Sequence, residues 1–258
     1  MALTLHHLRH RALRSALILA MIGALSACSM IEEDITADWD ADRLYHAARD
    51  AVEEANWDLA QDYYGKLEAR YPFGRYAQQA QIESAYTYWQ NGEAAEALLA
   101  CERFLKQYPN HANSDYVLYL KALCILNEPN GFFSRLVKQD LAERDAEAAR
   151  NAFDTFKELV QRFPQSRYAP EARRRMHELV LAQARYELNV AKYYFVRHAY
   201  VAAVERAQNV VRDFQQTPYA DEALALIRDS YRTLGVTELE ADVQKVIDAN
   251  ANRVRPGA

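Results

Sequence analysis

The sequence predicts an all-α protein, a right-handed α-solenoid of about five helix pairs that follows an N-terminal signal peptide. The first observation is repeated punctuation, because an aromatic-proline step follows an amphipathic stretch at Tyr71-Pro72, Tyr108-Pro109 and Phe163-Pro164. Proline cannot continue the helix before it and restricts the preceding residue, so each step ends one helix before another begins. The second observation is a fixed spacing ahead of each proline, and the third is a short apolar run near the N-terminus.

The spacing places an alanine twelve residues before each proline, and a large residue or a cysteine four residues after that alanine. The three copies are Ala60/Tyr64/Pro72, Ala97/Cys101/Pro109 and Ala152/Phe156/Pro164. A weaker fourth copy contains Ala191, Tyr194, Ala203 and Ala207, with a late proline at Pro218. Tetratricopeptide repeats have small, bulky and proline residues in this pattern, since small residues let paired helices touch. We therefore expect tetratricopeptide-like helix pairs with one continuous core.

Residues 1–27 are predicted to be a lipoprotein signal peptide. Arginines but no acidic residues precede the apolar run Ala16–Leu25, which is too short to cross a bilayer as a permanent helix. The next residues, Leu25-Ser26-Ala27-Cys28, resemble a bacterial lipobox, in which the cysteine is lipidated and becomes the new N-terminus. The alternative is an ordinary secretory signal cleaved after Ala27, with an incidental cysteine behind it.

The lipobox predicts a membrane anchor at Cys28, made of an S-diacylglycerol group and an N-acyl chain. Several acyl chains on one residue are enough for stable attachment. Ser29 follows the cysteine where an aspartate would favour the inner membrane, so we expect sorting to the outer membrane. Residues 28–40 then form an acidic tether, and no other cofactor and no metal is expected.

The repeats predict the organisation of the remaining chain. Residues 41–165 contain repeats 1–3, residues 166–250 contain repeats 4–5, and residues 251–258 form a flexible tail. The interval from Ala97 to Ala152 is 55 residues instead of the roughly 34 of one repeat. The surplus is an insertion at residues 127–145, which is either a lid on the array or a partner-binding loop.

Individual helix bounds follow from turn residues. Asn56 predicts a turn ahead of a helix that opens near Trp57, and Ser114 is a plausible N-cap for the first helix of repeat 3. After Pro170 no glycine or proline interrupts the chain for a long stretch, which predicts one long helix. The expected C-terminal helices are Tyr168–Val196, Tyr200–Phe214, Tyr219–Leu234 and Thr237–Asn250.

Charge and composition exclude two classes of function. After signal removal, 28 Lys and Arg face 36 Asp and Glu, a net charge of −8, whereas nucleic-acid binding calls for a basic footprint. The histidines of the mature chain are scattered, and neither a glycine-rich phosphate loop nor a nucleophile–base motif is present. We therefore expect a protein that is not an enzyme and binds no nucleic acid; a hydrolase on a helical scaffold would need a catalytic constellation.

Two cysteines leave alternatives open. Cys101 is expected in the second helix of repeat 2 and Cys124 in the first helix of repeat 3, and such helices stack directly. In an oxidising compartment the two thiols bridge if their β-carbons are close and aligned. Otherwise they serve as two small buried apolar residues.

Aromatic and arginine residues crowd into the first three repeats. Phe73, on a turn beside Gly74, is hard to bury inside its own helix pair. Tyrosine rings offer apolar contact with a polar tip, and arginine pairs with a terminal carboxylate, so a surface of both suits an extended peptide. The predicted peptide pocket consists of Arg70, Tyr71, Phe73, Arg75, Tyr76 and Tyr116.

Several motifs resemble one family, the BamD family of tetratricopeptide lipoproteins of the outer-membrane β-barrel assembly machine. The resemblance covers essentially the whole mature chain, with departures at Gln215, where a proline is usual, and at Arg135–Ala142 in the insertion. The matching blocks, in chain order, are Arg70-Tyr71-Pro72-Phe73-Gly74-x-Tyr76-x-Gln78-Gln79, Asp115-Tyr116-Val117-x-Tyr119, Gly131-Phe132-Phe133, Arg144-Asp145 and Val190-Ala191-x-Tyr193-Tyr194.

The resemblance implies five tetratricopeptide-like repeats on a lipid anchor in the outer membrane of a Gram-negative bacterium, facing the periplasm. In such proteins the N-terminal repeats face unfolded outer-membrane proteins, whose targeting signal is a C-terminal stretch ending in an aromatic. The C-terminal repeats dock the central barrel protein through its periplasmic domains, along with accessory lipoproteins. On this basis Arg206 and Arg212 are expected to pair with acids of that partner, although both also fit a solvated helix face.

The resemblance leaves one alternative of the same fold. A periplasmic tetratricopeptide adaptor for cell-wall synthesis or division machinery has the same helices without binding the barrel protein. Such adaptors often carry a coiled coil, and the sequence contains no heptad pattern of that kind.

Overall fold

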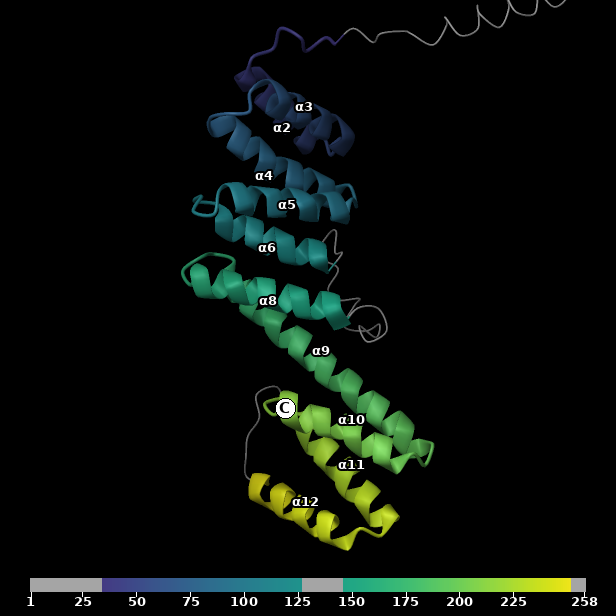
Figure 1. The fold of residues 1–258 in the computed structure, drawn as a ribbon. Helices are drawn as coiled ribbons and strands as arrows, with labels where there is room; N and C mark the ends of the chain where they lie inside the picture. Colours follow the sequence, from purple (N-terminus) through teal and green to yellow (C-terminus); the bar gives the residue numbers. More distant parts are fainter. Residues whose placement is uncertain (1–33, 127–145, 252–258) are drawn as a thin grey trace, which may run out of the picture. The chain divides into compact units, whose positions relative to one another are not determined.

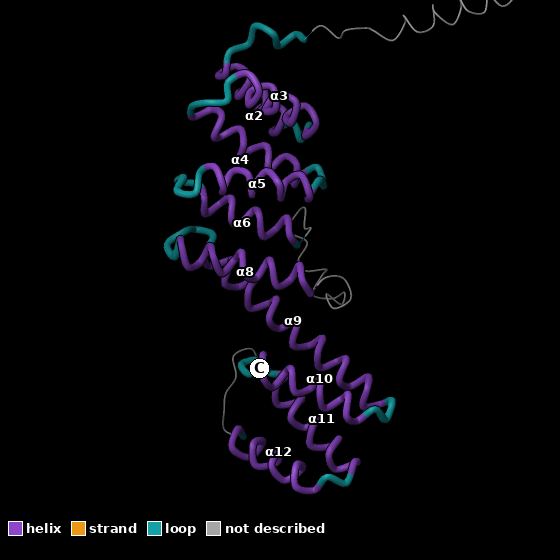
Figure 2. The backbone as a smooth tube through the Cα atoms, in the orientation of Figure 1, coloured by secondary structure: helices purple, strands orange, loops and turns teal. Residues whose placement is uncertain are grey.

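The computed structural model describes residues 34–126 and 146–251. Residues 34–40 belong to one unit, and all the helices belong to a second unit that begins at Ala41. The described part of this second unit contains ten helices and no strand (Figure 1, Figure 2). The signal peptide, Cys28, the insertion at 127–145 and the tail at 252–258 lie outside the described residues. The helices are α2 (Ala41–Glu53), α3 (Trp57–Arg70), α4 (Arg75–Gln90), α5 (Ala94–Gln107), α6 (Ser114–Ile125), α8 (Ala146–Arg162), α9 (Ala169–Val196), α10 (Tyr200–Asp213), α11 (Tyr219–Leu234) and α12 (Thr237–Asn250).

The predicted all-α fold is confirmed, and the helix order is consistent with five pairs. Each described helix packs on the next described helix along the chain. In addition α2 contacts α4, and α4 contacts α6, so the first helices of successive pairs adjoin one another. None of the described helices is both long enough and apolar enough to cross a membrane.

The repeated alanines are the close-contact points of this packing. Ala60, Ala97 and Ala152 have no exposed surface, and neither do the residues four positions later, Tyr64, Cys101 and Phe156. An alanine side chain lets two helix backbones approach, and the bulky residue fills the space beside it. The weaker fourth copy behaves alike, since Ala191, Ala203 and Ala207 are fully buried as well.

Turn chemistry explains where the early helices end. The Asn56 side chain accepts a hydrogen bond from the backbone N–H of Leu59 at 3.4 Å, which caps α3 at the predicted place. At the other end Tyr71 donates its backbone N–H to the carbonyl of Leu67 at 2.8 Å, and Pro72 stops the helix. Gly74 then adopts a φ of +98°, a conformation that favours glycine, and α4 begins at the next residue.

The predicted N-cap role of Ser114 is wrong. The residue before α6 is Asn113, whose side chain makes no cap hydrogen bond. Ser114 is the first residue of the helix and is completely buried. Its hydroxyl donates backwards to the carbonyl of Tyr108 at 3.3 Å, because the preceding turn folds over the end of α5 and brings that carbonyl within reach.

The long helix α9 joins two separate clusters of buried residues. Its first half, including Ala172 and Leu179, belongs to a cluster that also contains residues of α4, α5, α6 and α8. Its last turns, including Leu188 and Ala191, belong to a second cluster with α10 and α11. Because α9 is 28 residues long, its middle is not needed to complete either cluster. Figure 1 shows α9 running from beside α8 to beside α10.

Candidate functional site

The turn between α3 and α4 presents the two aromatic residues that the sequence singled out. Phe73 is 90% exposed and Tyr71 is 37% exposed, so neither is a core residue of the first helix pair. Burying such a ring would release about 25 cal/mol per Å² of apolar surface, so a 90% exposed phenylalanine has binding energy to offer a partner. Arg70 is the last residue of the preceding helix.

Arg75 and Tyr76 lie at the start of α4 and turn toward α2. The guanidinium of Arg75 stacks 4.8 Å from the ring centre of Tyr76, and its Nη2 donates to the tyrosine hydroxyl at 3.2 Å. That hydroxyl in turn donates to the carboxylate of Asp42 on α2. The ring of Tyr76 also lies 5.3 Å from the ring of Tyr45. These contacts fix both predicted residues in a tyrosine cluster between the two helices.

Tyr116 belongs to a different part of the surface. Its ring lies 5.5 Å from that of Tyr168, which also stacks on Tyr119 at 5.0 Å. Burial raises the pKa of Tyr116, and nearby Glu83 raises it further. The structure therefore divides the six predicted peptide residues among the α3–α4 turn, the α2–α4 cluster and the α6 cluster, rather than collecting them in one pocket.

The sequence reasoning missed the residues that lie between these groups. Arg49 on α2 approaches Glu83 on α4, with 3.9 Å between Nη1 and Oε1. The Gln79 amide donates to the same Oε1 at 2.9 Å. We call the surface formed by the first helices of the early pairs the tyrosine face. It comprises Tyr45, Arg49, Tyr76, Gln79, Glu83, Tyr86, Tyr116, Tyr119 and Tyr168.

A spacing signal for this face was present in the sequence. Tyr45 and Arg49 are four residues apart, Gln79 and Glu83 are four apart, and Tyr86 follows three residues later. Residues three and four apart lie on one face of a helix. The same stripe on α2 and α4 therefore marks one continuous surface once the two helices are known to adjoin.

The two arginines predicted to meet a partner are already paired within this chain. Arg206 on α10 lies 3.3 Å from Glu187 on α9, measured from Nη1 to Oε2. Arg212 donates to Asp213 at 2.9 Å and to Asn209 at 2.9 Å. The hydrogen bond from Arg212 lowers the pKa of Asp213, although both side chains are exposed and such pairs contribute little stability. Both arginines thus keep their charge at the surface.

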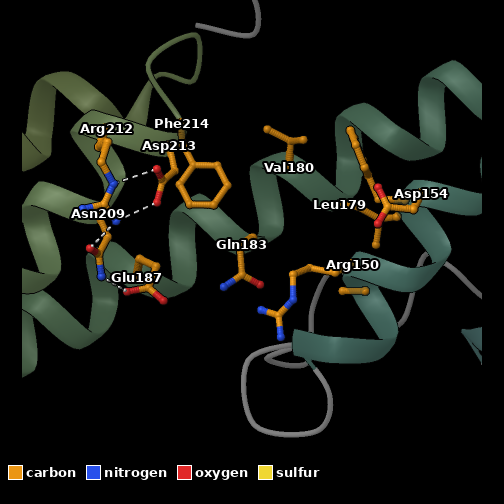
Figure 3. Close-up of a pocket in the computed structure, with 12 residues that line it drawn as sticks. Arg150, Asp154, Leu179, Val180, Gln183, Glu187, Asn209, Arg212, Asp213 and Phe214 are labelled. Atoms are coloured by element: carbon orange, nitrogen blue, oxygen red, sulfur yellow. Dashed lines mark hydrogen bonds and ion pairs between the residues drawn. The ribbon is translucent and has the colours of Figure 1, made fainter. Parts of the chain in front are cut away.

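Both arginines adjoin an apolar pocket of about 520 Å³ between α8, α9 and α10. Arg212 lines it directly, and Glu187, the partner of Arg206, lines it as well. Figure 3 shows Arg150 on the α8 side, Arg212 on the α10 side and Gln183 of α9 between them. Within the described residues Arg150 makes no ion pair. The lining consists of Ala149, Arg150, Phe153, Asp154, Leu179, Val180, Gln183, Glu187, Asn209, Arg212, Asp213 and Phe214.

The length of α9 produces this pocket. Its lining residues from Leu179 to Glu187 fall in the stretch between the two buried clusters. Helix α8 covers the preceding part and α10 covers the following part, so Val180 and Gln183 stay accessible. A pocket of this size with apolar walls and charged edges fits one or two apolar side chains of a protein partner.

The cysteine pair and the possible ligands of a metal complete the survey. Cys101 and Cys124 are free, buried thiols, and the pKa of Cys101 is raised by its hydrogen bond with Cys124 and by burial. Cys124 also lines a second cavity of about 710 Å³ between α5, α6 and α8. Across residues 34–126 and 146–251, no group of three histidine, cysteine or acidic side chains is placed to hold a metal ion.

Comparison with known proteins gives one family and several relatives. Residues 37–246 match the family model YfiO, described as an outer membrane lipoprotein. A protein of Neisseria meningitidis serogroup A, named outer membrane protein assembly factor BamD, is 43% identical over 88% of this chain and 87% of its own length. Proteins with the same name are 33% identical in Vibrio cholerae, over 90% of this chain and 96% of theirs, and 30% identical in Haemophilus influenzae, over 94% and 92%.

Proposed function

We propose that this chain, which belongs to the YfiO family of outer membrane lipoproteins, is a non-catalytic scaffold of outer-membrane protein assembly. The observation that carries the proposal is the agreement with relatives named outer membrane protein assembly factor, which extends over 88% of this chain and 87% of the relative. Such coverage includes both candidate surfaces, so the proposal concerns the whole chain and not one module.

The anchor in this proposal is Cys28, carrying S-diacylglycerol and an N-acyl chain on the periplasmic side of the outer membrane. Lipidation fits the absence of a membrane-crossing helix among the described residues, since the chain then needs another means of attachment. Replacing Cys28 with serine should release the protein from the membrane fraction without changing its helical content.

The two surfaces receive different partners in this proposal. The tyrosine face and the exposed ring of Phe73 bind extended segments of unfolded outer-membrane proteins. The pocket beside Arg206 and Arg212 binds the central barrel protein through its periplasmic domains, with accessory lipoproteins nearby. Apolar walls with charged edges support the second assignment, because stable interfaces combine a buried apolar centre with a polar rim.

The test is affinity purification of the lipidated chain from detergent-solubilised outer membranes, followed by mass spectrometry of what co-elutes in stoichiometric amounts. The proposal predicts a large β-barrel protein with repeated periplasmic domains. Recovery of cell-wall synthases or division proteins without that barrel would overturn the proposed function and favour the adaptor alternative.

A further inference from the structure

One buried hydroxyl of the first helix pair has no hydrogen-bond partner. Tyr64, on α3, has no exposed surface, and within the described residues its hydroxyl makes no hydrogen bond. An unsatisfied buried polar atom destabilises a protein, so a tyrosine in such a place calls for a reason. The same repeat position is occupied by Cys101 and Phe156 in the next two repeats, both fully buried. Packing alone is therefore satisfied there without a hydroxyl.

The surroundings of this hydroxyl are polar and belong to the tyrosine face. The ring of Tyr64 lies 6.2 Å from that of Tyr45 on α2. Arg49 and Glu83 are close enough to act on it electrostatically: burial and then Glu83 raise the pKa of Tyr64, whereas Arg49 opposes the shift. A cation, a carboxylate and an unpaired hydroxyl thus meet where α2, α3 and α4 adjoin.

The contacts of Arg49 and Glu83 leave hydrogen-bonding capacity unused. Their separation of 3.9 Å exceeds the 2.7–3.2 Å of a direct N–H to oxygen bond. Both Gln79 and Arg49 approach Oε1 of Glu83, and Oε2 accepts no hydrogen bond in the part of the chain that the structure describes. The Arg49 side chain is 44% exposed, so it is free to move aside and admit a ligand.

A ligand group that fits must accept a hydrogen bond and donate one a short distance away. The Tyr64 hydroxyl and the Arg49 guanidinium donate, and Oε2 of Glu83 accepts. An amide has this combination in one planar unit, with a carbonyl acceptor and an N–H donor. A carboxylate ligand does not fit as well, because it would face Glu83 with a like charge.

We propose that Arg49, Tyr64 and Glu83 form an amide clamp that binds a main-chain amide of an extended client peptide. The client carbonyl accepts from Tyr64 and Arg49, and the client N–H donates to Glu83. This inference rests on the proposed function, which assigns client segments to the tyrosine face. Binding through the main chain lets one site take many client sequences, since every residue except proline carries the same amide.

The central experiment replaces Tyr64 with phenylalanine in the full-length mature lipoprotein in detergent. The probe is a fluorescein-labelled ten-residue peptide of alternating Val and Thr that ends in Phe and contains no Asn or Gln, so only main-chain amides are available. Fluorescence anisotropy should give a Kd about two- to tenfold higher for Tyr64→Phe than for the unchanged protein, the effect of one net hydrogen bond. The urea midpoint should stay the same or rise. Tyr219→Phe on α11 is the matched control and should leave the Kd unchanged.

The outcomes separate this inference from the proposed function. If the unchanged protein does not bind the peptide, client binding fails and the clamp fails with it. If it binds and Tyr64→Phe binds equally well, the clamp is wrong while client binding stands. A lower urea midpoint with an unchanged Kd would show that the hydroxyl serves the fold through a buried water, and this too would overturn the clamp.

A second experiment identifies the main-chain amide itself. Peptides methylated at one backbone nitrogen at a time lose one N–H donor each. The clamp predicts one position at which methylation weakens binding to the unchanged protein and has a smaller effect on a Glu83→Gln variant. Equal losses in both proteins at every position would contradict it, because energies that simply add indicate independent sites.

Discussion

The tyrosine face and the α8–α10 pocket differ in how they hold their polar groups. On the tyrosine face, rings of α2, α4 and α6 contact one another in series, and Arg49 and Glu83 are only loosely paired. Around the pocket the walls are apolar, and Arg206 and Arg212 are both paired with acids of their own chain. The first surface offers unused hydrogen bonds, whereas the second offers apolar area and a fixed rim.

This difference suggests two kinds of partner. Unused hydrogen bonds suit ligands of variable sequence, because the main chain supplies the missing donors and acceptors. Apolar pockets with charged rims suit one partner of fixed shape, since complementarity there depends on individual side chains. The two surfaces also rest on separate buried clusters, joined by α9. Damage to one surface should therefore leave the other functional.

The largest expected effect tests whether the two clusters are separate. Phe156 on α8 is fully buried in the first cluster, so Phe156→Ala should lower the free energy of unfolding by about 3–5 kcal/mol. Hydrogen exchange should accelerate in α5, α6 and α8 more than in α11. Phe153→Ala, at the half-buried wall of the pocket, is the control and should cost less. Equal acceleration in α11 would show that the clusters unfold as one.

The next effect concerns client binding without a change in stability. Because Phe73 is 90% exposed, Phe73→Ala should leave the urea midpoint unchanged. It should weaken binding of an aromatic-ended peptide by about tenfold, as expected for an aromatic residue central to an interface. Leu99→Ala, which also removes an exposed apolar side chain, should leave peptide binding unchanged. A lower urea midpoint in Phe73→Ala would instead make Phe73 a core residue.

Arg206 tests whether its charge serves the fold or a partner. Arg206→Glu places two carboxylates together at Glu187 and should cost less than about 1 kcal/mol of stability, because the pair is partly exposed. Co-purification of the barrel protein should be lost. The double variant Arg206→Glu with Glu187→Arg restores the pair within the chain, and the account predicts that co-purification stays lost. Its recovery would assign Arg206 a structural role.

The smallest effects compare one carboxyl group from each cluster. Burial raises the pKa of Glu68 on α3, so its favourable contribution is present at acidic pH and is lost as pH rises through the folded-state pKa. The hydrogen bond from Arg174 lowers the pKa of Glu171 on α9, so its contribution is present at neutral pH and is lost as pH falls through the folded-state pKa.

These opposite directions predict opposite variants. At pH 7 Glu68→Gln should raise the free energy of unfolding, and Glu171→Gln should lower it, each by less than about 1 kcal/mol. Both differences should vanish at acidic pH, where the glutamates are protonated. Urea unfolding at several pH values measures this, and a change of the same sign in both variants would contradict the assignments.

Much of the fold was predictable because it depends on local patterns. Gly235 ends α11 in a left-handed conformation, and the bounds of α11 and α12 agree with the predicted ranges. The repeated alanines were predictable for a similar reason, since close helix contacts tolerate few other residues. By contrast, Ser114 was a misleading signal, because its hydroxyl found a carbonyl in the preceding turn instead of capping its own helix.

The candidate site was less predictable, because it depends on which helices adjoin. The sequence identified Phe73 and Tyr76 but could not show that their turn and helix face different surroundings. It also gave no sign that Tyr64, in a repeat position otherwise apolar, would keep its hydroxyl unpaired beside Arg49. The pocket depends on the length of α9, which was predicted, and on where α8 and α10 end against it, which was not.

The most direct test of the two-surface account is photo-crosslinking in living cells from single positions on each surface. A photoreactive amino acid replaces Phe73 at the tyrosine face, Val180 in the pocket, or Leu99 as the control. The account predicts short-lived crosslinks to newly made outer-membrane proteins at position 73 that disappear when synthesis stops. Position 180 should give a constant crosslink to one barrel protein, and position 99 should give neither. The same crosslinked protein at both 73 and 180 would contradict the division of the molecule into a client surface and a partner surface.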